Sequence, residues 1–277
     1  MRRTGQPYKI YRVDESDAPE TRGRSWAGDS ISENIQLCDY QTIAPTLLMY
    51  LPRAGRVLES GCGLGRWVFY LRERGFNITG IDLARPAIEM AKAYDPSVPI
   101  VFDDVLHSQY PDGSFAAAIS LGVVEHFEEG PQRALAELHR VLRDDGILLI
   151  SVPVQNLLRK LLTNRLKDAY RWYRKRQGMV FVFEEYRFTR EEFRSYLESA
   201  GFEISEVVPD DFRPPKNMGL YADYPFLHDR HKKWELNALG KVLSRMLDAL
   251  SPWVTCAGVH YVCWKRRLGF PAPLAEH

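Results

Sequence analysis

The segment RVLESGCGLG at residues 56–65 constrains the fold of this chain more than any other. A short apolar run ends there, directly before three glycines spaced two apart, Gly61, Gly63 and Gly65. Residues 66–75 then show apolar side chains at helical spacing, and a second apolar run ends at Asp82. The order of strand, glycine turn, helix and strand is typical of a nucleotide site at the carboxyl edge of a parallel sheet.

Asp82 and the glycines have complementary tasks in such a site. Glycine allows the backbone to turn sharply and lets a ligand approach it closely. Asp82 follows the first glycine by about twenty residues, where a carboxylate can accept hydrogen bonds from both ribose hydroxyls. The sequence therefore predicts that the bend and Asp82 face one ligand.

The spacing of the glycines distinguishes between nucleotides. A dinucleotide fingerprint reads G-x-G-x-x-G, whereas this segment reads G-x-G-x-G, with Arg66 in the sixth position. Glu59 precedes the glycines, and a carboxylate there would repel a pyrophosphate but suits an ammonium group. An acid followed by G-x-G-x-G resembles the first motif of class I S-adenosylmethionine (SAM) methyltransferases, of the type 11/12 kind. We therefore favour SAM, with S-adenosylhomocysteine as the product, over NAD.

Composition narrows the class of protein. The 277 residues suffice for one large domain or one domain with insertions, and the net charge of +1 gives no reason to expect a nucleic-acid partner. The four cysteines show no metal-ligand spacing, so we expect free thiols in a reducing compartment. No apolar run is long enough to cross a membrane, and residues 1–16 do not resemble a secretory signal. We expect a cytoplasmic protein; the sequence does not indicate its oligomeric state.

The remaining pattern predicts an α/β fold. Apolar strands alternate with amphipathic helices, which favours a Rossmann-like, doubly wound and mostly parallel seven-stranded sheet. The resemblance implies that the last strand, near residues 258–266, is antiparallel beside the fifth. We expect residues 1–29 to be a flexible arm and residues 30–277 to be the methyltransferase domain. Insertions at about 155–187 and 210–256 are expected to form a helical lid.

The resemblance also implies which residues hold the cofactor. Glu59 and the glycine bend would face the methionine end, Asp82 the ribose, and an acid after the third strand the adenine. The sheet edge beyond the fourth strand would run beside the sulfonium, because ligands bind outside the carboxyl ends of the strands. The expected cofactor residues are Glu59, Gly61, Cys62, Gly63, Gly65, Asp82, Leu83, Asp103, Asp104, Val105, Leu121, Gly122 and Val123.

Glu125 and His126 follow Val123 at the same edge of the sheet. A histidine there could deprotonate an acceptor hydroxyl, since its unperturbed pKa lies near neutrality. A helix-start residue bonded to the backbone is the alternative. Some related O-methyltransferases bind a metal with an E-H pair and an earlier glutamate, but that earlier position here is Gly122, so we expect no metal.

The two insertions should contact the acceptor. The first carries many Lys and Arg residues between leucines and aromatics, which fits an acidic substrate, a nucleic acid, an anionic membrane surface or simply a solvated helix face. Peripheral membrane contact therefore stays an alternative. The candidate acceptor-binding residues are Trp26, Tyr40, Tyr221, Tyr224 and His228.

The function expected from these features is methyl transfer from SAM to an oxygen or nitrogen of a small molecule. A lipid-linked or macromolecular acceptor, RNA or protein, is the alternative among methyltransferases. A non-catalytic SAM-binding protein or an NAD-binding Rossmann protein is the alternative outside them.

Overall fold

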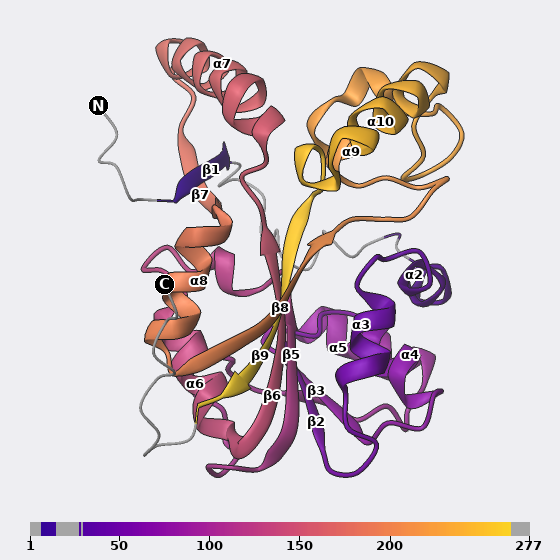
Figure 1. The fold of residues 1–277 in the computed structure, drawn as a ribbon, viewed down its shortest axis with the longest axis vertical. Helices are drawn as coiled ribbons and strands as arrows, with labels where there is room; N and C mark the ends of the chain where they lie inside the picture. Colours follow the sequence, from indigo (N-terminus) through magenta and orange to yellow (C-terminus); the bar gives the residue numbers. More distant parts are fainter. Residues whose placement is uncertain (1–6, 15–27, 29, 267–277) are drawn as a thin grey trace.

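The computed structural model describes residues 7–14, 28 and 30–266, and its centre is a seven-stranded sheet. The sheet has the order β4-β3-β2-β5-β6-β9-β8 (Figure 1). Its strands are β2 (Val57–Ser60), β3 (Ile78–Asp82), β4 (Ile100–Phe102), β5 (Phe115–Leu121), β6 (Leu142–Pro153), β8 (Phe202–Asp210) and β9 (Gly258–Lys265). The predicted α/β fold is confirmed.

The pairing of β9 accounts for the mixed character of the sheet. Strands β2 to β6 pair in parallel, whereas β9 runs antiparallel to both β6 and β8. The predicted antiparallel last strand is thus confirmed. Because the other six strands share one direction, their carboxyl ends meet at a single edge of the sheet.

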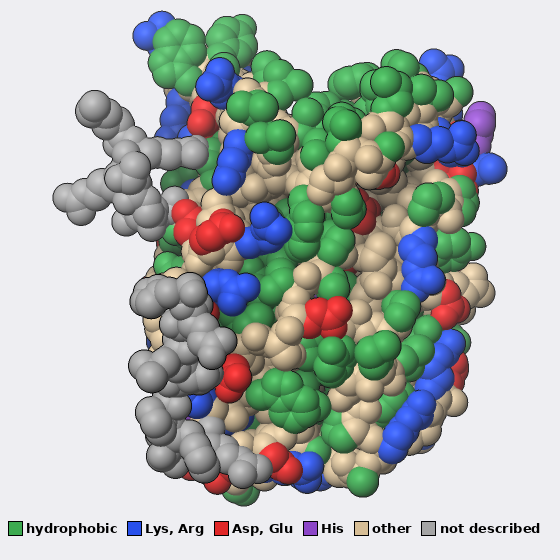
Figure 2. All heavy atoms as spheres, viewed as in Figure 1, with side chains coloured by type: hydrophobic (Ala, Val, Ile, Leu, Met, Phe, Trp, Pro, Cys, Tyr) green, Lys and Arg blue, Asp and Glu red, His purple; other side chains and the backbone are tan. Residues whose placement is uncertain are grey.

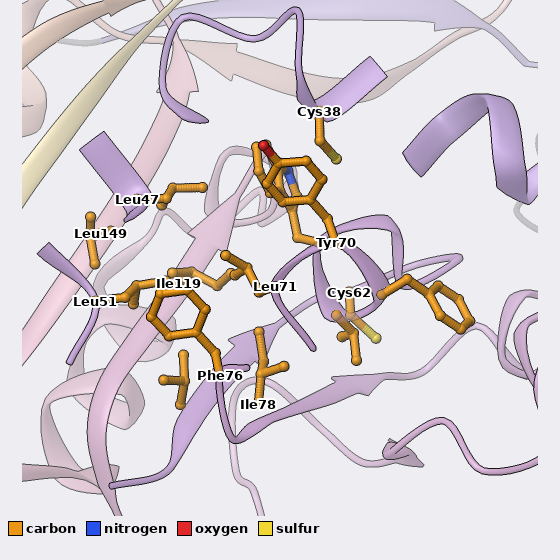
Figure 3. Close-up of a cluster of buried hydrophobic side chains, with 14 of the residues drawn as sticks. Cys38, Leu47, Leu51, Cys62, Tyr70, Leu71, Phe76, Ile78, Ile119 and Leu149 are labelled. Carbon is orange, nitrogen blue, oxygen red and sulfur yellow. The ribbon is translucent and has the colours of Figure 1, made fainter. Parts of the chain in front are cut away.

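Helices cover both faces of the sheet. One face carries α2 (Ile31–Cys38), α3 (Ala44–Tyr50), α4 (Arg66–Arg72) and α5 (Arg85–Tyr94), and the other carries α6 (Gln132–Val141) and α8 (Arg190–Ser199) (Figure 1). Figure 3 shows the first of the two cores, where Leu47 and Leu71 of these helices meet Ile119 and Leu149 of the strands. Continuous apolar strands such as β5 are explained by this cover on both sides.

The sequence signals for helix ends are realised in the structure. At the start of α8, the Thr189 hydroxyl accepts a hydrogen bond from Glu192 N, and the Glu192 carboxylate accepts one from Thr189 N. This reciprocal capping box satisfies two backbone donors that a helix start would otherwise leave unpaired.

Part of the expected N-terminal arm is ordered as a strand. Tyr8–Val13 form β1, which pairs antiparallel with β7 (Phe181–Arg187) of the first insertion in a separate two-stranded sheet. Tyr8 is buried, and its hydroxyl donates to Asp168 Oδ1 over 2.9 Å. The pairing partner lies some 170 residues away in the chain, so no local pattern around residue 8 could announce it.

The two insertions rise above the carboxyl edge of the sheet. The first contains a π-helical turn (Arg159–Thr163), α7 (Asn164–Arg176) and β7. The second contains α9 (Gly219–Asp223), the short helix Pro225–Leu227 and α10 (Ala238–Leu250). In Figure 1, α7 stands at the upper left and α10 at the upper right.

A buried ion cluster joins the bases of the two insertions. The side chain of Asp223 is 2% exposed and accepts from Arg159 Nε over 2.6 Å, from Arg187 Nη1 over 3.1 Å and from Lys167 Nζ over 3.3 Å. Burial alone would raise its pKa, but the three cations hold the pKa of Asp223 far below its usual range. Arg159 also donates to the Val154 and Ala257 carbonyls at the sheet edge. The insertions are therefore fixed to each other and to the sheet.

Candidate active site

The glycine bend and Asp82 lie side by side at the carboxyl edge. Strands β2 and β3 pair in parallel with Glu59 opposite Gly80, which places Asp82 two residues beyond the partner of Glu59 on the neighbouring strand. Gly63 N donates to Asp82 Oδ2 over 2.7 Å, and Ala84 N donates to Asp82 Oδ1 over 2.8 Å. Each carboxylate oxygen can accept more than one hydrogen bond, so both keep capacity for ligand hydroxyls.

The bend can only be built from glycine. Gly61 has a φ of +80° and Gly65 a φ of +75°, in the left-handed region that side chains rarely adopt. A Cβ at Gly61 would overlap the Val123 side chain, and one at Gly65 would overlap Ile100 Cδ1. Gly61 thus brings the backbone of the bend against the segment that follows β5, and Gly65 brings it against β4.

Glu59 is a buried carboxyl without a full set of partners. It is 4% exposed, and its Oε2 has no hydrogen-bond partner among the described residues. Burial raises the pKa of Glu59 to about 8, while the nearby charge of Arg66 opposes that rise. A buried acceptor of this kind is stabilised by a ligand that brings an ammonium group. The Glu59 carboxyl beside the bend therefore fits the ammonium group at the amino-acid end of SAM.

The ends of β3 and β4 bring the expected adenine-side residues together. Asp103 N donates to the Asp82 carbonyl over 3.1 Å, and Leu83 is half-exposed at the same edge. The two acids organise the turn after β4: Asp103 accepts from Asp104 N over 2.9 Å, and Asp104 accepts from Leu106 N over 2.8 Å. Both acids thus have a structural role in addition to any contact with a ligand.

The segment after β5 forms the next part of the rim. Gly122 has a φ of +74°, and its N–H donates to the Ser151 carbonyl of β6 over 3.1 Å. Leu121 and Val123 are partly buried beside it, and Val123 closes over Gly61. Val123 therefore lies against the glycine bend, and Leu121 and Gly122 directly precede it; that the three run beside the sulfonium stays a prediction.

One ring nitrogen of His126 is hydrogen-bonded to the backbone, and the other can accept a proton. Its Nδ1 lies 2.9 Å from the Glu184 carbonyl oxygen, which can only accept, so the neutral ring carries its proton on Nδ1. The Nε2 lone pair is then available to take a proton, and the side chain is 46% exposed. The contact with Glu184 is the backbone bond expected of a structural histidine, and it also fixes the tautomer that a base requires.

Two further acids at this edge have raised pKa values, the buried Glu125 and the partly buried Asp210. Burial raises the pKa of Glu125 well above its usual value, and the charges of Glu185 and Asp210 act in the same direction. Burial likewise raises the pKa of Asp210, to about 7, although a hydrogen bond from Ser151 opposes the shift. Sequence reasoning did not single out Ser151 or Asp210, although each lies near the carboxyl end of a strand that the sequence does predict.

The candidate acceptor-binding residues do not all lie in one part of the structure. The ring of Tyr221 stacks on His228, with centroids 3.6 Å apart, and the Tyr224 hydroxyl lies 2.7 Å from Thr163 Oγ1 of the first insertion. Tyr40 lies in the turn after α2, where the Lys216 ammonium sits 5.3 Å from its ring centroid. Trp26 lies outside the described residues. The structure thus groups Tyr221, Tyr224 and His228 and leaves Tyr40 apart.

The described residues offer neither a metal-binding cluster nor a membrane-spanning helix. Across residues 7–14, 28 and 30–266, no three His, Cys, Asp or Glu side chains are arranged to hold a metal ion. Within the same ranges, no helix has the length and apolar character needed to cross a bilayer. The four cysteines are free and buried.

Comparison with known proteins agrees with this geometry. A family model described as a methyltransferase domain matches residues 33–207. Malonyl-(acyl-carrier protein) O-methyltransferase from Serratia marcescens is 32% identical over 106 residues, which are 38% of this chain and 41% of that protein. The chain spans about two fifths to just over half of the length of the first curated relatives it matches.

Solved structures share the fold. A SAM-dependent methyltransferase from Methanosarcina mazei superposes with a TM-score of 0.56 at 19% identity, covering 80% of this chain and 98% of the other. The (4+2)-cyclase SpnF superposes with a TM-score of 0.54 at 21% identity, covering 84% and 81%. At these identities the likeness concerns the architecture alone.

Proposed function

The chain belongs to the class I SAM-dependent methyltransferase family, with SAM as the donor, and we propose that it methylates an oxygen or nitrogen of a small-molecule acceptor. The observation that supports SAM as the donor is the buried Glu59 carboxyl, whose Oε2 lacks a partner within the described chain beside the glycine bend. The pyrophosphate of a dinucleotide is anionic, and a carboxylate at that position would repel it.

The cofactor is assigned to three parts of the rim. Glu59 and the glycine bend receive the methionine end, with the ammonium against the carboxylate of Glu59. Asp82 accepts from the ribose hydroxyls, which adds to the backbone bonds that it already receives. The adenine is placed against Leu83, Asp103, Asp104 and Val105, and the sulfonium beside Leu121, Gly122 and Val123, with Cys62 within the bend.

Methyl transfer from SAM requires few catalytic side chains from the protein. SAM supplies a methyl group that is already activated, so the protein mainly has to hold the acceptor in line and keep water out. Orientation of this kind is worth on the order of 7–11 kcal/mol. His126 accepts the proton of the nucleophile at Nε2, because its Nδ1–H is bound to the Glu184 carbonyl.

The choice of an oxygen or nitrogen acceptor rests on His126 and on one relative. A neutral imidazole can accept the proton that a hydroxyl or ammonium must lose, whereas a thiolate needs no base. The S. marcescens relative is by name an O-methyltransferase. We place the acceptor between the rim and the cluster of Tyr221, Tyr224 and His228.

A lipid-linked acceptor is the second candidate. It is favoured by large apolar side chains that remain exposed on both insertions, including Leu166 and Met246. A substrate with an acyl or isoprenyl chain could lie along such surfaces while its polar end reaches the rim.

The fate of a labelled methyl group tests the proposal. The full-length protein is incubated with SAM labelled in the methyl group and a cell extract, which is then divided into polar small molecules, lipids, protein and nucleic acid. We expect label among the polar small molecules, and label in the lipid fraction would favour the second candidate. Label in protein or nucleic acid alone would contradict both.

A variant of His126 tests the assignment of the base. His126→Ala should lower the rate of label transfer by about 10²–10⁴-fold while leaving the affinity for S-adenosylhomocysteine unchanged. His107→Ala, which alters an exposed histidine away from the β5 rim, is the control and should match the wild type. An unchanged rate in His126→Ala would remove it as the base.

A further inference from the structure

Helix α7 presents its apolar side to solvent. Leu166, Tyr170 and Tyr173 fall on one stripe at 100° per residue, and each is between 54% and 57% exposed; Leu162, in the π-helical turn before α7, is 45% exposed. The helix start buries polar residues instead, since Thr163 and Asn164 are 3% and 5% exposed. A surface helix of a globular protein normally has the opposite arrangement. The exposed apolar side of α7 is therefore unlike a solvated helix face.

Helix α10 of the second insertion repeats this arrangement. Leu239, Val242, Met246 and Leu250 occupy positions i, i+3, i+7 and i+11, and they are between 52% and 78% exposed. Phe226, in the short helix before α10, is 70% exposed. We call the exposed stripes of α7 and α10, together with Phe226, the apolar rim.

The apolar rim lies at one end of the molecule. Figure 1 places α7 and α10 on either side of the same end, above the carboxyl edge of the sheet, and Figure 2 shows hydrophobic side chains gathered over both. The Asp223 cluster and the contact between Thr163 and Tyr224 hold the two insertions together at their bases. The two stripes are thus held in a fixed relation, on the side where the cofactor rim opens.

The charge beside the stripes indicates the chemistry of the partner. Helix α7 carries six Lys and Arg residues against Asp168 as its single acid, although the chain as a whole has a net charge of +1. The Arg176 guanidinium lies 3.9 Å from the centroid of Trp172, and that of Arg174 lies 5.5 Å from the centroid of Tyr170. Leucine, interfacial tryptophan and tyrosine, and flanking arginine are the combination that suits a bilayer surface with anionic headgroups.

Other occupants fit this composition less well. A second copy of the chain would bring two strongly basic helices together, with like charges opposed. A nucleic acid would pair with the arginines but leave the leucine stripe and Met246 without a partner. An anionic bilayer satisfies both parts, because the apolar side chains enter the acyl boundary while the cations stay among the headgroups.

We propose that the apolar rim docks on an anionic lipid bilayer, with α7 and α10 lying in the interface and the cofactor rim facing the membrane. Docking of this kind needs neither SAM nor methyl transfer. It therefore stands or falls independently of the function proposed above. It also gives the lipid-linked acceptor a route to the rim.

Flotation with vesicles tests the proposal on the full-length protein. Vesicles of phosphatidylcholine are compared with vesicles that also contain phosphatidylglycerol. We expect the protein to float with the second kind and to remain unbound with the first. Equal behaviour with both, or no flotation with either, would overturn the proposal.

Variants locate the contact on the molecule. Leu166→Glu and Met246→Glu should each weaken vesicle binding by at least about tenfold, since they place a charge in the acyl boundary. Arg174→Gln should weaken it by about fivefold, as expected for one cation near an anionic surface. Met49→Glu, at an exposed methionine on α3, is the matched control and should bind as the wild type does. Wild-type binding by the stripe variants would overturn the proposal.

Two further measurements separate the other occupants. Sedimentation velocity showing a dimer that Met246→Glu dissociates would assign the apolar rim to a second copy and overturn membrane docking. Retention of the protein on single-stranded RNA, lost in Arg174→Gln but kept in Met246→Glu, would overturn it as well. Binding of S-adenosylhomocysteine should be the same in every variant, which shows that each is folded and that docking is distinct from cofactor binding.

Discussion

At the scale of single residues, cofactor binding depends on two carboxyl groups that differ in their hydrogen bonding. Asp82 is bonded to two backbone N–H groups, whereas the Glu59 oxygen Oε2 has no partner in the described part of the chain. Asp82 is therefore prepared to hold hydroxyl groups in a fixed position. Glu59 is prepared to change its protonation when a cation arrives.

Replacing Asp82 tests the ribose assignment. Asp82→Asn keeps the size of the side chain and one oxygen, but it removes the charge that strengthens bonds to both hydroxyls. Hydrogen bonds to charged groups contribute roughly 1.5–3 kcal/mol each. The dissociation constant of S-adenosylhomocysteine, measured by calorimetry, should rise by at least about a hundredfold. Asp95→Asn, on the surface beside Arg72, should leave it unchanged. Wild-type affinity in Asp82→Asn would remove Asp82 from the ribose.

The pH dependence of cofactor binding tests Glu59. Burial raises its pKa to about 8 in the free protein, above the ordinary value of 4.5, so the carboxyl is mostly protonated at neutral pH. The ammonium of the ligand favours the charged carboxylate, so binding releases a proton, and affinity should rise with pH until about pH 8. Below that pH the slope should approach about tenfold per pH unit.

A variant isolates the contribution of Glu59 from that of Asp210. Glu59→Gln cannot release the proton, so its affinity should be weaker and its slope with pH smaller. Calorimetry in two buffers of different ionisation enthalpy counts the proton directly. The same proton release in Glu59→Gln and in the wild type would assign it to another group.

The sequence predicted some of these residues but not all. Glu59, the glycines and Asp82 could be found because they are close in sequence to the strand ends that position them. Ser151 and Asp210 could not, because their meeting depends on β9 entering between β6 and β8. The carbonyl that fixes the tautomer of His126 comes from Glu184, in a strand that the sequence did not predict.

At the scale of elements, the glycine bend is fixed by close packing as much as by backbone conformation. Gly61 and Gly75 offer a matched comparison, with φ angles of +80° and +82°. A Cβ at Gly61 would overlap Val123, whereas one at Gly75 would have no atom within 4 Å.

The comparison yields a prediction about stability. Gly75→Ala should lower the free energy of unfolding by about 1–2 kcal/mol, the cost of the left-handed conformation for a residue with a Cβ. Gly61→Ala should cost about 1–3 kcal/mol more, because Val123 must also move. Unfolding in urea measures both. Equal losses would show that Val123 does not press on the bend.

Helices and strands that are marked by a pattern in their own residues were predicted, whereas strands that depend on pairing with a segment far away in the chain were not. The strand before the bend follows from its apolar run, α4 follows from its helical spacing, and α8 follows from its capping box. β1 and β7 pair across most of the chain, so part of the expected flexible arm becomes a strand that supports α7. Their stability comes from the pairing, which no window of the sequence contains.

At the scale of the whole molecule, the Asp223 cluster unites the insertions. Asp223→Asn would leave Arg159 and Arg187 buried without their shared anion, which should cost about 3–5 kcal/mol of unfolding free energy. Asp112→Asn, which alters an 83% exposed side chain paired with Arg140, is the control and should leave the urea midpoint unchanged. A similar midpoint in both variants would mean that the cluster does not hold the insertions together.

The same cluster predicts a loss of stability in acid. The pKa of Asp223 is lower in the folded protein than in the unfolded chain, so its stabilising contribution is complete above the unfolded pKa of about 3.8 and falls as pH drops below it. Asp223→Asn should therefore show a shallower decline between pH 4 and pH 3 than the wild type. Identical declines would place the acid-sensitive group elsewhere.

The central claim is that the carboxyl edge of this sheet binds the adenosyl and amino-acid parts of SAM and not a dinucleotide. The most direct measurement is the free energy of unfolding of the full-length protein with either ligand present. At a hundred times its dissociation constant, S-adenosylhomocysteine should stabilise the fold by about 2.7 kcal/mol, and NAD at the same concentration should have no effect. Stabilisation by NAD equal to or greater than that by S-adenosylhomocysteine would contradict the account.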